Sequence, residues 1–301
     1  MKRKVKVSVI IPTYNRNKIL TETINSVLVQ KFRSFELLVI DQSHKHDKFT
    51  TNYLDNLKDK RFRYYKVTPP SLPAARNFGL KKSQAGIIIY IDDDVVLDDG
   101  FIKAHYESYS KRKAVAVAGR IKEKNKPVSD KLLFLRKTSF GAGNFNYPHY
   151  AYAETAQGCN MSYKKTLLKK IGGFDTNFIG NAMREESDVS FKIRKLGKKI
   201  LYNPKASLFH KFYKSGGCRE KTTIHDSYII YRNEIIFFLR HRPILYFPYF
   251  FAGHFFKYVL NRELLKHRLF LPRLKVFLQG LFIGMIVFFF PKERIVVKEV
   301  R

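Results

Sequence analysis

The chain of 301 residues contains no tryptophan and only two cysteines, Cys159 and Cys218. Two cysteines cannot form the framework of a disulfide-rich secreted domain; they fit a reducing compartment and are expected to pack as small core residues. Glycine and proline are also scarce, at 16 and 11 residues, which excludes a collagen-like or low-complexity chain. Hydrophobic residues make up 45% of the sequence, and this excludes intrinsic disorder.

Acidic residues are few, because 25 Asp and Glu stand against 57 Lys and Arg, and the net charge is +32. This excess predicts an anionic partner: nucleic acid, anionic lipid or a phosphorylated small molecule. The basic residues form no basic tail and no nucleic-acid-binding motif is present, so nucleic acid is the least favoured of the three. The apolar stretch Val7–Ile11 is too short for the apolar region of a signal peptide, which predicts a cytoplasmic protein.

Residues 1 to about 240 alternate short apolar runs with amphipathic stretches. Three runs are rich in valine and isoleucine, as buried parallel strands are: Val5–Ile11, Phe35–Ile40 and Ile87–Ile91. Between them, Thr21–Val29 and Ala74–Lys82 have the pattern of helices. The alternation predicts a doubly wound α/β layer, which binds ligands at the carboxyl ends of its strands.

Residues 241–301 differ in composition from the rest of the chain. Pro243–Leu260 is dense in Phe, Tyr and Leu, and Val276–Phe290 is an apolar run broken by one glutamine. Both fall short of the roughly 20 apolar residues of a spanning helix. Basic residues lie between them: Arg262, Lys266, Arg268, Arg273 and Lys275. We expect interfacial or re-entrant helices on an anionic membrane, peripheral to its inner face. The alternative is a pair of apolar helices packed on the rest of the protein or on a second copy.

The strongest chemical signal is the aspartate triplet Asp92–Asp94, which comes directly after the apolar run Ile87–Ile91. Three adjacent carboxylates repel one another, so the arrangement is costly without a cation. Mg²⁺ or Mn²⁺ prefers such oxygen ligands and also binds the oxygens of a diphosphate. A solvated acidic turn is the alternative. The segment Pro12–Arg16 and Asp41 come after the first two strands, so they are expected at the same edge of the sheet.

Five segments resemble, in the expected order, motifs of the family 2 glycosyltransferases: Val7–Arg16, Leu72–Gly79, Asp92–Asp94, Gly158–Ser162 and Gly172–Asp175. The resemblance covers about residues 5 to 240. It implies a GT-A type mixed sheet flanked by helices, with a nucleotide-sugar half over about 1–120 and an acceptor half over about 121–240. It also implies metal-dependent, inverting transfer of one sugar from a nucleotide-sugar to an acceptor hydroxyl.

The resemblance also implies roles for single residues. Eight would bind the nucleotide-sugar: Pro12, Thr13, Tyr14, Asn15, Asp41, Arg76, Asp92 and Asp93. Of these, Asp41 would bind the base and Arg76 the diphosphate. Asp94 would bind the metal directly, with Asp92 and His210 as further ligands. A strand-end turn, a surface ion pair and a structural histidine are the alternatives for Asp41, Arg76 and His210. The family's usual "VDDGS" is here Ile40-Asp41-Gln42-Ser43, which keeps the first aspartate.

The base of such enzymes generally belongs to an acidic pair at the start of a helix, here within Arg184–Arg194. Spacing predicts the inward face of this helix: Val189, Ile193 and Leu196. Aligned to the family pattern, Glu186 takes the place of the base, and Glu185 is the second candidate. Asp188 is the third, and its spacing predicts a pair with Lys192 in a solvent-side or positioning role. An acid favoured by the helix N-terminus is the alternative for each.

Tyr231-Arg232-Asn233 resembles a motif of the non-processive members, and the absence of Trp argues against the Trp-containing motif of the processive synthases. Arg232 would help to hold the diphosphate or lie on a helix surface. The expected acceptor is a polyprenyl-linked or cell-surface glycan. The closest alternative is a nucleotidyltransferase on a similar α/β scaffold, which needs the metal and the nucleotide but not the acidic helix.

Overall fold

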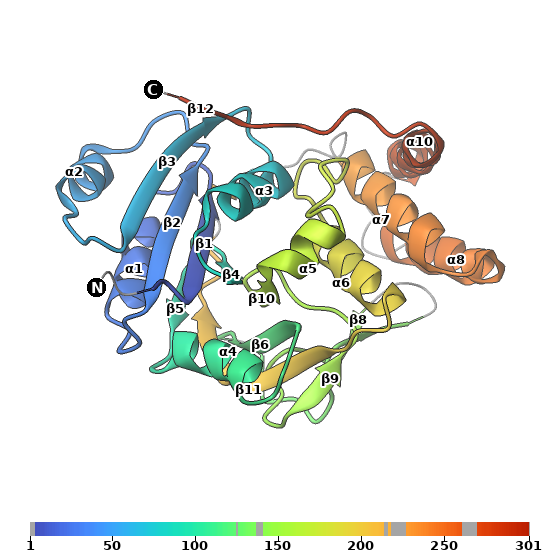
Figure 1. The fold of residues 1–301 in the computed structure, drawn as a ribbon. Helices are drawn as coiled ribbons and strands as arrows, with labels where there is room; N and C mark the ends of the chain where they lie inside the picture. The colour runs from blue at the N-terminus through green and yellow to red at the C-terminus, as the bar shows by residue number, and fades with distance from the viewer. Residues whose placement is uncertain are drawn as a thin grey trace.

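The computed structural model describes residues 4–124, 126–136, 141–213, 216–217, 227–260 and 270–300. Its centre is a ten-stranded mixed sheet flanked by helices (Figure 1). Nine strands are arranged in the order β12-β3-β2-β1-β4-β10-β6-β11-β5, and β9 pairs with β11. Cys218 and three of the expected basic residues, Arg262, Lys266 and Arg268, lie outside the described residues.

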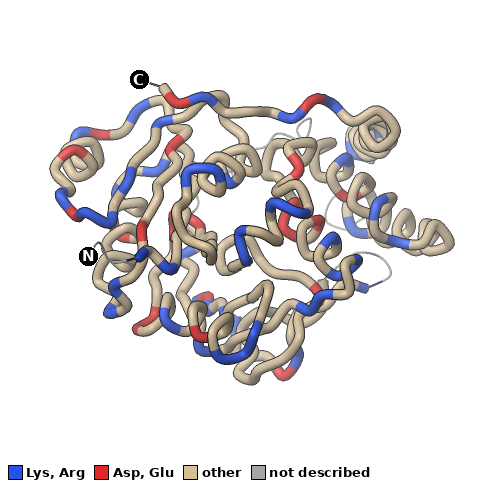
Figure 2. The backbone as a smooth tube through the Cα atoms, in the orientation of Figure 1, with Lys and Arg blue, Asp and Glu red and all other residues tan. Residues whose placement is uncertain are grey.

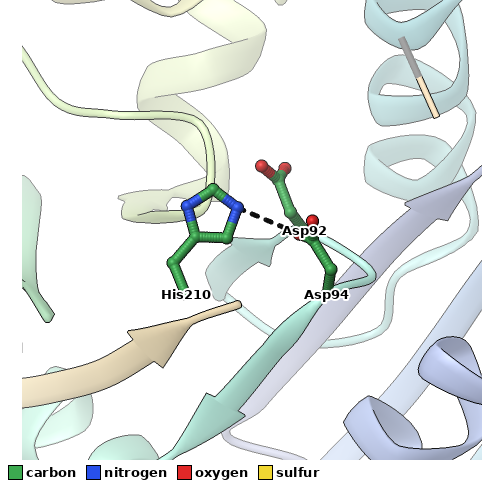
Figure 3. Close-up of side chains that lie close together, drawn as sticks. All are labelled: Asp92, Asp94 and His210. Carbon is green, nitrogen blue, oxygen red and sulfur yellow. Dashed lines mark hydrogen bonds and ion pairs between the residues drawn. The ribbon is translucent and has the colours of Figure 1, made fainter. Parts of the chain in front are cut away.

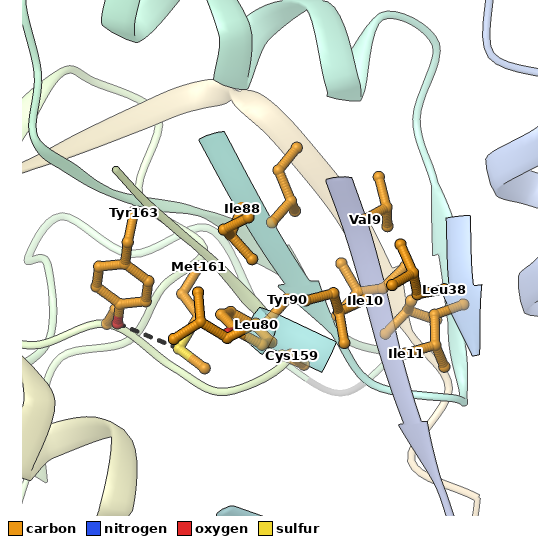
Figure 4. Close-up of a cluster of buried hydrophobic side chains, with 14 of the residues drawn as sticks. Val9, Ile10, Ile11, Leu38, Leu80, Ile88, Tyr90, Cys159, Met161 and Tyr163 are labelled. Atoms are coloured by element: carbon orange, nitrogen blue, oxygen red, sulfur yellow. Dashed lines mark hydrogen bonds between the residues drawn. The ribbon is translucent and has the colours of Figure 1, made fainter. Parts of the chain in front are cut away.

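Four parallel strands form the N-terminal part of the sheet: β1 (Val7–Thr13), β2 (Phe35–Asp41), β3 (Phe62–Thr68) and β4 (Ile87–Ile91). Three helices connect them: α1 (Lys18–Leu28), α2 (Lys48–Asn56) and α3 (Leu72–Lys82). Every residue of β1 and β2 is buried, as expected where layers cover both faces. Their apolar side chains pack with Leu80 of α3 and the neighbouring strands (Figure 4). The predicted strands and helices of this part are confirmed.

The second part of the sheet contains antiparallel pairs. β10 (Asn160–Lys164) is antiparallel to β4 and to β6 (Ala116–Lys122), and β11 (Ile200–His210) runs parallel to β6. The short β5 (Val95–Leu97) pairs with the end of β11, so that His210 lies opposite Val95. β9 (Ala151–Ala153) also pairs with β11, and β7 (Phe134–Leu135) and β8 (Gly141–Ala142) form a separate two-stranded sheet. The helices of this region are α4 (Phe101–Ser110), α5 (Lys165–Lys170) and α6 (Glu185–Lys195). The pairing of β5 with β11 brings the end of β11 beside the triplet at the end of β4.

Helices dominate the C-terminal part: α7 (Tyr228–His241), the 3₁₀ turn η3 (Ile244–Tyr246), α8 (Phe247–Tyr258) and α10 (Phe270–Phe289). α10 packs along α7 through two glycines. A Cβ atom on Gly284 would lie 2.2 Å from Ile235 and 2.8 Å from the carbonyl oxygen of Arg232, and one on Gly280 would lie 2.5 Å from the carbonyl oxygen of Tyr228. The two helices therefore approach as closely as they do only because both positions are glycine.

The length of α10 corrects one expectation from the sequence. The helix begins at Phe270, six residues before the apolar run from Val276, and it has 20 residues with a mean hydropathy of 1.6. Among the described residues it is the one helix that is long and apolar enough to cross a membrane by length and composition. About a third of its most apolar stretch, 33%, is buried against the protein. The apolar run from Val276 underestimates the length of the helix, because Arg273 and Lys275 lie in the first turns of α10 and interrupt its apolar sequence.

The segment after α10 returns to the rest of the protein. The backbone N–H of Lys292 donates to Asn177 Oδ1 at 3.1 Å, and that of Ile295 donates to Thr176 Oγ1 at 2.9 Å. The segment then adds β12 (Lys298–Glu299) antiparallel to the edge strand β3. In Figure 1 it runs as a red strap from α10 to β3. We call residues 291–300 the C-terminal strap.

Candidate active site

A cleft of about 630 Å³ opens at the carboxyl ends of β1 and β4. Ten of the predicted site residues line it: Pro12, Thr13, Tyr14, Arg76, Asp92, Asp93, Asp94, Glu185, Glu186 and His210. Because β1 and β4 are adjacent and parallel, the segments after them emerge side by side. Three predicted residues, Asn15, Asp41 and Asp188, are not among those that line it.

Asp92, Asp94 and His210 form a cluster at the floor of the site (Figure 3). One potential ligand atom from each lies within 4.8 Å of the others, and His210 Nε2 is 3.0 Å from Asp94 Oδ1. Burial alone would raise the pKa of Asp94, but His210, Arg16 and the backbone N–H of Tyr213 outweigh it and hold that pKa below its usual value. Asp94 is therefore ionised at neutral pH.

The donor set fits a divalent cation. Two carboxylates supply the oxygen ligands that Mg²⁺ and Mn²⁺ prefer, and a histidine nitrogen adds a third ligand. The nitrogen of His210 that faces Asp94 is Nε2, so Nε2 is the atom that would bind a cation (Figure 3). The other ring nitrogen, Nδ1, is buried without a hydrogen-bond partner in the described part of the chain and lies on the opposite side of the ring. The structure brings together the three ligands predicted from the sequence.

Arg16 is a cation to which the sequence assigned no separate role. Its Nε lies 3.3 Å from Asp93 Oδ1 and its Nη2 lies 3.4 Å from Asp94 Oδ2, with all three side chains buried. Burial raises the pKa of Asp93 to about 7 against the effects of Arg16 and of the Thr13 hydroxyl, which donates to Asp93 at 2.7 Å. The sequence contained a signal for this role, because three adjacent aspartates require nearby positive charge and Arg16 ends the segment predicted to lie beside them.

Arg76 and Glu185 form a buried ion pair between α3 and α6. The guanidinium of Arg76 also lies 3.4 Å from Asp92 Oδ1 and 3.3 Å from the carbonyl oxygen of Gly158, and it covers the ring of Phe174. Glu185 Oε2 is buried without a hydrogen-bond partner in the described part of the chain. Arg76 is thus no surface cation: it links the aspartate cluster to the acidic end of α6.

Glu186 lines the same cleft and is half-buried. Among the described residues its carboxylate has no ion-pair partner, whereas Glu185 is held by Arg76. Burial raises the pKa of Glu186, and the nearby Arg76 and Arg184 oppose that rise. A cleft carboxylate whose pKa is raised is a stronger proton acceptor than an ordinary carboxylate, as a general base must be.

Asp188 is directed to α7 instead of the cleft. It pairs with Lys192 at 2.6 Å, as its spacing predicts, and with His241 Nε2 at 2.7 Å. It is fully buried, so the solvent-side placement is wrong and a positioning role is the one its contacts allow. The predicted inward face holds for Val189 and Ile193, but Leu196 is 41% exposed because α6 ends at Lys195.

The Asp41 carboxylate is buried among neighbouring donors. Its Oδ1 accepts from the N–H of Ser43 at 2.8 Å, and its Oδ2 accepts from His46 Nε2 at 2.9 Å, from Lys66 at 3.2 Å and from the Tyr64 hydroxyl. Because the side chain is fully buried and does not line the cleft, a nucleotide base could contact it only if one of these neighbours moved. The neighbouring Gln42 does line the cleft, and its Oε1 accepts from the N–H of Ser71 at 3.0 Å.

Arg232 lies where the sequence did not place it, whereas Asn15 follows β1 as expected, between the cleft residues Tyr14 and Arg16. Arg232 is neither in the cleft nor on a helix surface: it is buried, and its Nη1 donates to the carbonyl oxygen of Asn177 and to Asn233 Oδ1. Asn15 has a left-handed backbone, φ 51°, and its N–H donates to Ser43 Oγ at 2.7 Å.

Comparison with known proteins shows the family to which this chain belongs. The family model described as glycosyl transferase family 2 matches residues 8–172, more than half of the chain, and the chain belongs to this family. A glucosyl-dolichyl phosphate glucuronosyltransferase of Haloferax volcanii is 24% identical over 69% of this chain and 70% of its own. An uncharacterized glycosyltransferase of Rickettsia felis is 42% identical over 30% of this chain, and the match spans only 15% of that relative.

Solved structures show the same fold. The S. aureus TarS fragment 1–349 in complex with UDP-GlcNAc superposes with a TM-score of 0.62 at 18% identity, over 92% of this chain and 81% of that chain. GalNAc-T7 with UDP, GalNAc and Mn²⁺ superposes with a TM-score of 0.60 at 16% identity, over 79% and 50% of the two chains. The GT-A type architecture expected from the sequence is confirmed.

Proposed function

We propose that the protein is a metal-dependent, inverting glycosyltransferase that moves one sugar from a nucleotide-sugar to an acceptor hydroxyl. The observation that carries the proposal is the union, in one cleft, of the Asp92, Asp94 and His210 cluster with the acidic start of α6. The two structural neighbours support it, because one holds UDP-GlcNAc and the other holds UDP with Mn²⁺. A nucleotidyltransferase would leave the acidic helix unexplained.

On the donor side, Pro12, Thr13 and Tyr14 form the wall against which a nucleotide would lie. Asp92, Asp94 and His210 would hold Mg²⁺ or Mn²⁺, which would neutralise charge on the diphosphate leaving group. Arg16 holds Asp93 and Asp94 in place between the loop after β1 and the loop after β4.

On the acceptor side, Glu186 would remove the proton from the attacking hydroxyl. An inverting displacement is in line, so the base and the leaving group lie on opposite sides of the anomeric carbon. Glu186 and the aspartate cluster both line the cleft. Arg76 connects the two sides, because it contacts Asp92 of the cluster and Glu185, the neighbour of Glu186. Glu185 is committed to Arg76, which leaves Glu186 as the carboxylate able to move a proton.

Calorimetric titration of UDP, GDP, dTDP and CDP, each with and without Mn²⁺, tests the donor side. We expect one nucleotide to bind, only in the presence of Mn²⁺, and the Asp94→Ala variant to lose that binding. Asp99→Ala is the matched control, since Asp99 is an exposed acid five residues further on. Metal-independent binding, or binding that survives Asp94→Ala, would refute the metal site.

We also propose that the C-terminal helices lie on an anionic membrane surface and that the acceptor is carried by a lipid or a surface glycan. The elements η3, α8 and α10 expose large apolar residues, and so does the residue after α10: Ile244, Leu245, Tyr249, Phe256, Leu271, Leu278, Phe282, Phe289 and Phe290. Basic residues are distributed over the whole backbone, as Figure 2 shows, which suits an anionic surface. The name of the Haloferax relative, which contains a dolichyl phosphate substrate, supports a lipid-linked acceptor.

Substitution of the exposed face tests membrane binding better than deletion, because removing residues 243–301 would also remove β12 from the sheet. The double variant Phe282→Gln, Phe289→Gln changes residues that are 62% and 68% exposed. We expect it to remain in the supernatant when sedimented with phosphatidylglycerol vesicles that pellet the unaltered protein. Phe49→Gln, at a residue 58% exposed on α2, should pellet normally. Equal pelleting of all three proteins would contradict the proposal.

A further inference from the structure

The turn that carries Glu185 and Glu186 starts from a strained residue. Arg184, the residue before α6, has φ 79° and ψ −2°, and no side chain caps the helix there. A left-handed backbone costs a residue with a Cβ atom about 1–2 kcal/mol, so it persists only where surrounding contacts hold it. The direction in which α6 leaves the preceding loop depends on those contacts.

The contact at this position is a buried ion pair with α7. Arg184 Nε lies 3.0 Å from both carboxylate oxygens of Glu234, and its guanidinium lies 5.3 Å from the ring centroid of Phe237. Burial by itself would raise the pKa of Glu234, but Arg184 and His254 outweigh it and lower that pKa. Glu234 is therefore a fixed negative charge at neutral pH.

A second contact holds α6 one turn further on. Asp188 bonds to His241 of α7 at 2.7 Å. Glu234 and His241 are seven residues apart on α7, so they lie on one face of that helix, and this face contacts both Arg184 before α6 and Asp188 in its first turn. Glu185 and Glu186 therefore lie between two residues, Arg184 and Asp188, that are both bound to α7. Nothing in the proposed chemistry uses Glu234 or His241 directly.

We propose that Glu234 is a positioning residue for the transfer reaction, which acts through Arg184 to fix the first turn of α6 and with it the carboxylate of Glu186. The inference rests on the proposed role of Glu186 as the base. The same carboxylate faces α8, since His254 Nε2 lies 3.7 Å from Glu234 Oε2 while His254 Nδ1 donates to the carbonyl oxygen of Phe250 at 2.8 Å. The aromatic helix α8 therefore contacts Glu234, the residue that we propose to orient Glu186.

Glu234→Asp in the full-length protein is the decisive variant, because it keeps the charge and withdraws the carboxylate by one methylene. A displacement of about 1 Å can cost 10²-fold in rate, so we expect UDP release from UDP-GlcNAc with Mn²⁺, with water as acceptor, to slow at least about tenfold. The dissociation constant of UDP should change less than about twofold, since Glu234 does not line the cleft. Amide hydrogen exchange should quicken in residues 184–188.

Two further variants separate positioning from folding. Arg184→Gly removes the ion pair but permits the left-handed backbone, and should slow UDP release as Glu234→Asp does. Arg184→Lys keeps a cation near Glu234 and should recover part of the rate. The inference is overturned if Glu186→Gln is slow while Glu234→Asp releases UDP as fast as the unaltered protein with unchanged exchange at 184–188. If instead Glu186→Gln is as fast as the unaltered protein, the proposed base fails, and the exchange result alone decides whether Glu234 fixes the turn.

Discussion

Replacement of Glu186 by glutamine is expected to slow sugar transfer by about 10²- to 10⁴-fold, the usual contribution of a general base, while nucleotide affinity stays the same. The amide keeps the size and shape of the side chain but cannot accept the proton of the acceptor hydroxyl. Glu186 makes no ion pair with another described residue, so its neutralisation leaves no buried cation without a partner. The measurement pairs a transfer assay with calorimetric titration of the nucleotide that binds.

The matched control is Glu185→Gln, one residue earlier in the same turn. Glu185 is bound to Arg76, so this change is expected to weaken the link between α3 and α6 and to lower stability and donor affinity. A loss of turnover at unchanged nucleotide affinity in Glu185→Gln, together with normal turnover in Glu186→Gln, would assign the base to Glu185 instead.

Arg76→Met is expected to lower the free energy of unfolding by about 3–5 kcal/mol, because it leaves a buried carboxylate without its cation. Arg76 and Glu185 are both about 2% exposed at the side chain, so water cannot replace the lost partner. The loss also frees Asp92, which Arg76 contacts at 3.4 Å. Denaturant unfolding followed by circular dichroism measures the change.

The double variant Arg76→Met, Glu185→Gln provides the internal check on this expectation. It removes both charges, so most of the stability lost in Arg76→Met should return, as in a double-mutant cycle of coupled residues. Additive losses in the double variant would show that Arg76 stabilises the protein through its packing on Phe174 and not through the ion pair.

The aspartate cluster could be predicted because strand ends are visible in a sequence. Asp92–Asp94 come directly after an apolar run, and the loops at the carboxyl ends of parallel strands gather at one edge of the sheet. His210 was placed by the family resemblance, and the structure supplies the reason: its strand pairs with β5, directly after the triplet. Short runs of valine and isoleucine indicated the strands well because both faces of those strands are buried.

Other features depend on partners far along the chain and left no local pattern. The donors that contact Asp41 Oδ2 come from His46, Tyr64 and Lys66, which only the fold brings together. Arg232 was expected either near the diphosphate or on a helix surface, yet α10 packs over the turn of α7 that carries it. No spacing or periodicity in the sequence predicts the contact of Glu234 with Arg184 or the pairing of β12 with β3.

The C-terminal strap has a geometric consequence for the acceptor. α10 is about 30 Å long and packs along α7, and the strap returns from its C-terminal end directly to the domain that carries α7, so that end of the helix stays beside the protein. Ile295 of the strap lines the cleft, six residues after Phe289 at the end of α10. Six residues span at most about 20 Å. A bilayer that meets the outer side of α10 would therefore hold the cleft at a fixed height, and only hydroxyls presented within that height would be reached.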